Sequence, residues 1–134
     1  MKVPLMEDTM RAQAQASVPQ TRTVLAKALL RAGELLGMSD ADLAAAIGVS
    51  PASLSRVRSS TRAIDPAGKE GELALIFLRM YRSLSALLGD TASCQKWFRS
   101  ENKHLGGGVP AELVLSIEGL VHVTGYLDAM RGKV

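Results

Sequence analysis

The segment Asp42–Val57, DLAAAIGVSPASLSRV, constrains the fold of this chain more than any other. Ala44 is small where two crossed helices would approach closely, and Gly48 is suited to end the first helix because glycine adopts a left-handed conformation without a Cβ clash. Ser50 is a good N-cap, and Pro51 is accepted at the first position of a helix. The segment therefore predicts a helix-turn-helix. Its apolar positions, which fall where the two helices would bury side chains against each other, are Leu43, Ile47, Val49, Leu54 and Val57.

The outward face of the second helix is small, hydroxylated or basic. Its members are Ala52, Ser53, Ser55, Arg56, Arg58, Ser59 and Ser60, and no acid occurs between Asp42 and Asp65. Small hydroxyl groups let a helix lie close to DNA and bond its phosphates, and arginine can bond guanine through two hydrogen bonds. We favour DNA binding. A helical hairpin without a DNA role stays open, because the same geometry occurs in domains that bind no nucleic acid.

The predicted DNA contacts divide into two kinds. Arg56 is the first candidate for reading bases, since it lies two turns or less from the start of the second helix and points away from Leu54 and Val57. Ala52 and Ser53 come next, because the first turn of such a helix lies deepest in the groove. Phosphate contacts are expected from Ser50, Arg58 and Arg62. The full predicted set is Ser50, Ala52, Ser53, Ser55, Arg56, Arg58 and Arg62.

Composition bounds the class of protein. The chain has 134 residues and a formal net charge of +3, so only a local basic patch is available for nucleic acid. The single cysteine, Cys94, excludes an internal disulfide and fits a reducing cytosol. The N-terminus lacks an apolar core of the kind found in signal peptides, and Arg79 and Arg82 interrupt the longest apolar run. We expect a cytoplasmic protein that does not cross a membrane.

The periodicity predicts an all-α chain, since no alternating strand pattern of useful length occurs. We expect a flexible tail over 1–22, a helix-turn-helix domain with its connector over 23–66, and a helical domain over 67–134. Helices are expected over about 23–36, 51–59, 72–88 and 117–130, with a further helix carrying Trp97 and Phe98. Another is expected to be capped by Ser39 or Asp40 and to end at Gly48. Pro66 places a connector at 61–66, because it forces Asp65 out of helical geometry.

The expected helix over 72–88 carries more large apolar side chains than its neighbours obviously cover. These are Leu73, Ile76, Phe77, Met80, Leu84, Leu87 and Leu88, with Arg79, Arg82 and Ser83 expected on the opposite side. The surplus is either a dimer seam or an interior face of its own domain, and the sequence leaves both readings open. A homodimer is expected on separate grounds, because one helix-turn-helix reads only half of a palindromic site.

The remaining chemistry-bearing residues indicate no catalytic or metal site. We expect Trp97 and Cys94 to be buried, and neither His104 nor His122 pairs with a carboxylate or thiol at metal-ligand spacing. The run Gly106–Gly108 follows no strand and lacks the lysine of a phosphate-binding loop, so it is interpreted as a chain-reversing loop. The sequence therefore predicts a protein that is not an enzyme and needs no cofactor.

The order of motifs behind the helix-turn-helix carries a family resemblance. The motifs are Leu88-Gly89-Asp90, Trp97-Phe98, Leu105-Gly106-Gly107, Pro110, Leu113, Gly119, Val123 and Leu127. In this order they resemble the toxin-binding domain of the Xre-type antitoxins, the MbcA/ParS/Xre family. The chain departs mildly from the family pattern, with WF in place of a WL pair and Ser100-Glu101-Asn102 where a Pro-Asn pair is common.

The resemblance implies a function. It implies an all-α protein whose Xre-like, lambda-repressor-like helix-turn-helix represses its own operon by binding promoter DNA. Its helical C-terminal domain would bind and neutralise a cognate toxin, often an NAD-consuming RES-domain enzyme. The C-terminal end would reach the toxin's anionic-substrate pocket, which gives Leu127, Met130, Arg131, Lys133 and Val134 as candidate toxin contacts. The alternative is a stand-alone repressor whose C-terminal domain dimerises or binds a small molecule.

Overall fold

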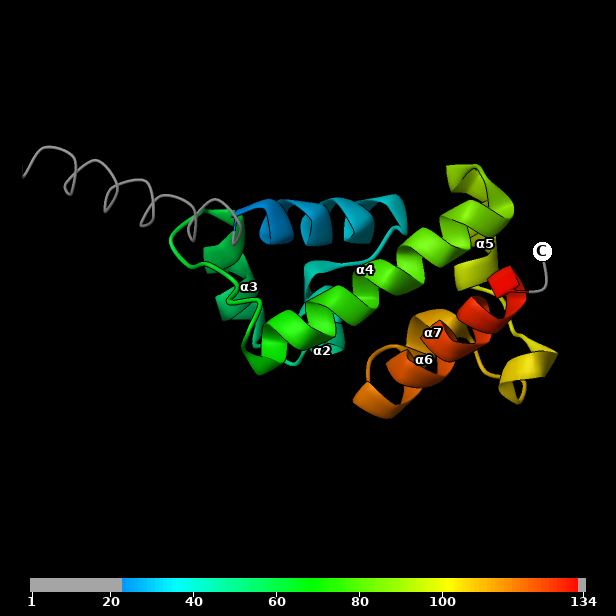
Figure 1. Ribbon diagram of the computed structural model, residues 1–134. Coiled ribbons are helices and arrows are strands. Elements are labelled where there is room, and N and C mark those ends of the chain that lie inside the picture. The colour runs from blue at the N-terminus through cyan, green and yellow to red at the C-terminus, as the bar shows by residue number, and fades with distance from the viewer. Residues whose placement is uncertain (1–22, 133–134) are drawn as a thin grey trace, which may run out of the picture.

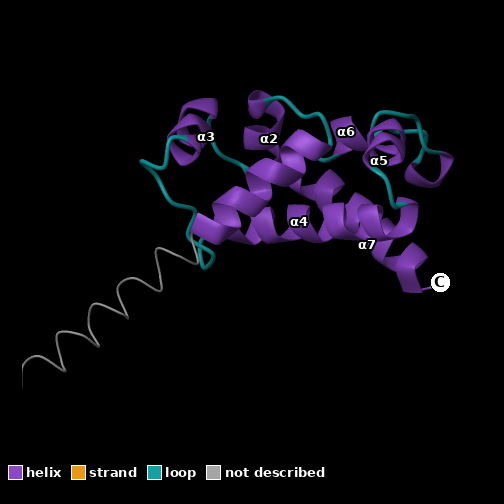
Figure 2. Ribbon diagram, turned by 90° about the horizontal axis from the view of Figure 1, so that it is seen from above, coloured by secondary structure: helices purple, strands orange, loops and turns teal. Residues whose placement is uncertain are grey.

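The computed structural model describes residues 23–132, and every regular element in that range is helical (Figures 1 and 2). A first helix covers residues 23–35 of the described range. It is followed by α2 (Asp40–Ile47), α3 (Pro51–Arg58), α4 (Lys69–Leu88), α5 (Thr91–Phe98), the 3₁₀ helix η1 (Lys103–Leu105), α6 (Pro110–Leu113) and α7 (Ile117–Gly132). The all-α prediction is confirmed. The predicted tail over 1–22, together with Lys133 and Val134, lies outside the described residues.

The turn between α2 and α3 is built as the sequence predicts. The Ser39 hydroxyl accepts a hydrogen bond from the Asp42 amide at 3.1 Å and so caps α2, and Gly48 ends that helix at a φ of 74°. The Ser50 hydroxyl then accepts from the Ser53 amide at 3.1 Å, with proline in the first turn of α3. Each cap satisfies a backbone group that a helix end leaves without an intrahelical partner.

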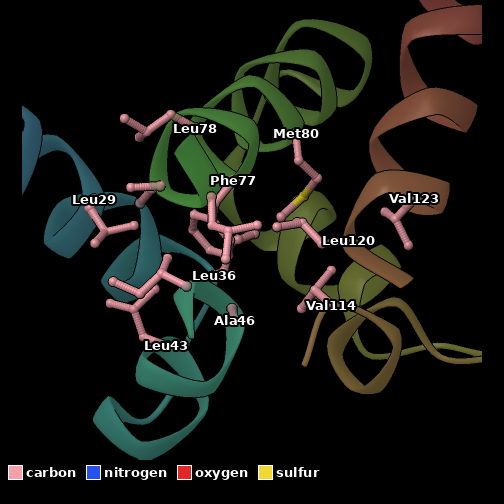
Figure 3. Packing of buried hydrophobic residues seen from close by; sticks show 14 of the residues in the cluster. Leu29, Leu36, Leu43, Ala46, Phe77, Leu78, Met80, Val114, Leu120 and Val123 are labelled. Atoms are coloured by element: carbon pink, nitrogen blue, oxygen red, sulfur yellow. The ribbon is translucent and has the colours of Figure 1, made fainter. Parts of the chain in front are cut away.

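The long helix α4 connects the two halves of the molecule. In Figure 1 it runs from the helix-turn-helix side to α5, and α7 lies alongside it. Figure 3 shows Phe77 pointing toward Leu36 on the helix-turn-helix side and Met80 pointing toward Leu120 of α7. Phe77, Met80 and Leu120 are fully buried in one apolar cluster that contains residues of both halves. The apolar surplus on α4 is therefore covered largely by this chain itself.

Two predicted positions within the C-terminal half are wrong. Ser83 was expected on the solvent side of α4, but it is fully buried because α7 packs against a second side of that helix. Trp97 was expected in the core, but it is only half-buried. Phe98 takes the interior position of α5 together with Cys94, because residues four apart share one helical face.

The glycine-rich loop reverses the chain, as predicted. Gly106 and Gly107 have φ values of 69° and 81°, and the Asn102 amide donates to the Gly108 carbonyl at 3.0 Å across the turn. The chain then enters α6 at Pro110, and the Ser116 hydroxyl accepts from the Gly119 amide at 3.1 Å at the start of α7. Within residues 23–132, no helix combines the length and apolar character that crossing a bilayer demands.

Candidate nucleic-acid interface and C-terminal surface

One line of polar side chains follows the outward face of α3. The Ser50 hydroxyl bonds the Ser53 hydroxyl at 3.0 Å, and an Arg56 guanidinium nitrogen lies 3.4 Å from the same Ser53 oxygen. These residues are three apart, so they stack along one side of the helix. Arg56 is exposed, while Leu54 and Val57 on the other side are buried and hold α3 against the core. Ala52 and Ser55 are also exposed on α3.

Arg58 is exposed but is held by carboxylates of the helix-turn-helix unit. Its Nε and a terminal nitrogen donate to the two carboxylate oxygens of Asp40 at 3.1 and 2.7 Å, and its other terminal nitrogen lies 3.5 Å from Glu34. The hydrogen bond that Arg58 donates to Asp40 raises the pKa of the Arg58 guanidinium. This two-pronged geometry ties α3 to α2 and to the first helix. Arg58 was expected to contact phosphate, and that role would require it to release these carboxylates.

Arg62 lies before α4 and is held in a similar way by Glu70, which lies in the first turn of that helix. One of its terminal nitrogens lies 3.0 and 3.1 Å from the two carboxylate oxygens of Glu70. Of the three arginines in the predicted DNA-binding set, Arg56 alone contacts no carboxylate within residues 23–132. The positive charge that is available to an approaching anion on α3 is therefore concentrated at one position.

The predicted toxin contacts near the C-terminus are unequally accessible. Leu127 is 1% exposed and belongs to the core, so its side chain does not project from the protein surface. Met130 is half-buried and Arg131 is exposed. The predicted contacts at Lys133 and Val134 fall outside the described range. Met130 and Arg131 are therefore the accessible members of this set, whereas Leu127 can contribute only to the lining of a pocket.

A polar network between α4 and α7 supports this end of the chain. The buried Ser83 hydroxyl donates to Asp128 at 3.1 Å, and Arg79 bonds the other oxygen of the same carboxylate at 2.7 Å. Arg131 in turn lies 3.4 Å from the Ser83 oxygen. Sequence reasoning missed Ser83 and Asp128 as a pair, because they are far apart in the chain and only the packing of α7 on α4 brings them together.

An apolar groove of about 180 Å³ opens where α4, α5 and α7 meet. Its lining includes an aromatic stack: the ring centres of Trp97 and Tyr126 are 6.5 Å apart and their planes differ by 7°. His104 of η1 stacks on the same Tyr126 ring at 5.8 Å. Sequence reasoning missed this groove, because its members come from separate helices. Its lining residues are Leu84, Leu87, Leu88, Trp97, Tyr126, Leu127 and Met130.

The one cysteine of the chain is structural. Cys94 is buried as predicted, and burial raises the pKa of its thiol, which disfavours the reactive thiolate. Among residues 23–132, no group of three histidine, cysteine or acidic side chains is arranged to hold a metal ion.

Comparison with known families gives two matches, which follow one another along the chain. Residues 16–79 match the antitoxin Xre-like helix-turn-helix domain, and residues 83–133 match the antitoxin Xre/MbcA/ParS C-terminal toxin-binding domain. The first match contains α2 and α3 and ends inside α4, whereas the sequence placed a boundary at residue 66. The second contains every residue that lines the apolar groove. No curated protein matches the chain.

Proposed function

Because the chain belongs to the Xre-type antitoxin family, we propose that it is the antitoxin of a type II toxin–antitoxin operon, that it neutralises a cognate RES-domain toxin and that it represses its own promoter. The observation that carries the proposal is the order of the two matched domains in one chain, a helix-turn-helix followed by a toxin-binding domain. The absence of enzymatic activity and the cytoplasmic location stay predictions.

The toxin proposal is tested by expressing the adjacent open reading frame with and without this chain. We expect the reading frame alone to arrest growth and deplete cellular NAD⁺, and co-expression to restore both. Arrest and rescue without NAD⁺ depletion would reject a RES-domain toxin but keep an antitoxin. If the adjacent product neither arrests growth nor co-purifies with this chain, the alternative of a stand-alone repressor is preferred.

The DNA proposal places α3 in the major groove with Arg56 as the main base reader. Ala52 and Ser53 approach the bases beside it, and Ser50 and Ser55 contact phosphates from the exposed side of the helix. The carboxylate-free environment of Arg56 supports this assignment, because a guanidinium that need not leave a carboxylate bonds a guanine edge at lower cost. Arg58 and Arg62 would have to leave Asp40 and Glu70 to bind phosphate, so we rank their contribution below that of Arg56.

A gel-shift titration of the operon's own promoter tests this ranking. Arg56→Ala should weaken binding by about 1–3 kcal/mol and relax sequence preference, as the loss of a two-bonded guanine contact does. Arg82→Ala is the matched control, since Arg82 is also exposed but lies on α4. Equal affinity for wild-type and Arg56→Ala protein would remove Arg56 from the interface.

We also propose that two copies of the chain bind the operator together. The support is that one helix-turn-helix reads a half-site, and that Leu75, Ile117 and Val121 stay 49%, 59% and 50% exposed. Sedimentation of the free protein and footprinting of the promoter test this proposal. A monomer that protects one isolated half-site would contradict it.

A further inference from the structure

We propose that the apolar groove between α4, α5 and α7 is the docking site for the cognate toxin, and that it receives one large apolar side chain of the toxin flanked by acidic residues. The inference rests on the proposed function and specifies which surface performs it. The groove consists of the seven lining residues given above. Two of them, Trp97 and Tyr126, stack on each other, and His104 stacks on Tyr126 without lining the groove.

The size of the groove sets the kind of group that fits it. Its volume of about 180 Å³ is slightly larger than the ~150 Å³ of an apolar cavity that admits benzene. One aromatic ring or one branched aliphatic side chain therefore fills it. The lining is dominated by leucine and aromatic side chains, and buried aromatic anchors in such pockets dominate the energetics of protein interfaces.

The stacked rings make the groove ready for binding before a partner arrives. Trp97, Tyr126 and His104 come from α5, α7 and η1, and their near-parallel planes restrain one another. A preformed pocket loses little conformational entropy when it is filled, which favours affinity. Trp97 thus stays half-exposed in the free chain, in contrast to the fully buried Phe98 beside it.

Two observations favour the toxin over a second copy of this chain as the occupant. All groove residues fall inside the match to the toxin-binding domain, whereas the separate exposed residue Leu75 lies in the helix-turn-helix match. The segment from α5 through η1 is also basic, with Lys96, Arg99 and Lys103 against the single acid Glu101. Lys96 and Lys103 are exposed there, so they complement a partner that carries acids around its apolar side chain.

The test uses full-length protein and the purified product of the adjacent open reading frame, in a catalytically inactive form if the active form is toxic. Leu88→Glu and Met130→Glu place a charge in the groove at partly exposed positions, and Val24→Glu, at a 67% exposed position on the first helix, is the matched control. We expect both groove variants to lose at least tenfold in toxin affinity by calorimetry. Their helix content and promoter binding should match those of the wild type, and Val24→Glu should bind the toxin normally.

A second readout does not depend on substitutions. Trp97 is the only tryptophan of the chain, so 5-fluorotryptophan labelling puts one ¹⁹F reporter in the groove. We expect its resonance to shift when unlabelled toxin is added, and to stay in place when promoter DNA is added. We also expect raised salt to weaken toxin binding. Lys103→Glu should weaken it in part, because it removes one of the basic charges near the groove segment.

The outcomes separate the inference from the proposed function. If wild-type protein binds the toxin, but both groove variants bind it equally well and the ¹⁹F resonance does not move, the toxin docks elsewhere and the inference is overturned. It is also overturned if the groove variants change only self-association, because the groove is then a contact between copies. If the wild-type chain binds no product of the adjacent gene, the proposed function itself fails.

Discussion

Two glycines on α7 should respond in opposite directions to the same substitution. A Cβ added at Gly119 would lie 2.6 Å from the carbonyl carbon of Leu113, and closer still to the carbonyl oxygen, because α6 turns directly over the start of α7. A Cβ added at Gly125 meets no atom within 4 Å. Alanine in place of an unhindered helical glycine stabilises by about 0.5–1 kcal/mol, whereas overpacking costs about 1–3 kcal/mol.

Gly119→Ala should therefore lower the free energy of unfolding by about 1–2 kcal/mol, and Gly125→Ala should raise it by about 0.5–1 kcal/mol. In urea, with a slope of about 1.5 kcal/mol/M, the two midpoints should differ by about 1–2 M. Circular dichroism at the helix band is the measurement. A midpoint for Gly119→Ala at or above that of the wild type would refute the close approach of the Leu113 carbonyl to α7.

Three further perturbations follow from the ion pairs, the caps and the core. Arg58→Met should cost about 0.5–1 kcal/mol of stability, while Arg56→Met should change it by less than about 0.5 kcal/mol, because only Arg58 joins α3 to neighbouring carboxylates; equal urea midpoints would contradict this. Asp90 caps α5, and its carboxylate accepts hydrogen bonds from the amide and the hydroxyl of Ser93. These bonds lower the pKa of Asp90 below its ordinary 3.8, so the stability from this cap is present above that pH and is lost as the pH falls through the folded-state value. The midpoint temperature of thermal unfolding should therefore fall more steeply below about pH 4 in the wild type than in Asp90→Asn. Parallel curves of midpoint against pH would exclude this cap as the cause. The Cys94 thiol, buried and with a raised pKa, should react with a thiol reagent at least about tenfold more slowly in the folded chain than in urea, and equal rates would show that the site opens readily.

Local signals determined the helices and their ends. Ser39, Gly48 and Ser50 act through backbone groups within four residues, so a reader of the sequence alone could place the helix-turn-helix and its caps. The order of short motifs from Leu88 to Leu127 identified the family, because each motif is a contiguous feature of the chain. The exposure of Arg56 was also predictable, since the 3.6-residue period places it opposite Leu54 and Val57.

The tertiary structure decided what each helix face meets. Periodicity assigned Ser83 to solvent, because it cannot tell whether a helix is covered on one side or two; α7 covers the second side and pairs Ser83 with Asp128. Likewise, Trp97 and Phe98 are equally apolar in the sequence, and only the packing of α5 buries one and leaves the other in the groove.

The sequence by itself thus determined an all-α antitoxin-family chain with a recognition helix that carries Arg56, because these properties depend on neighbours along the chain. Only the tertiary structure decided that Arg58 and Arg62 are held by carboxylates, that Leu127 is in the core, and that three aromatic rings from different elements stack. These contacts join residues from separate helices. Their distances are set by how the helices pack, and no local pattern encodes that packing.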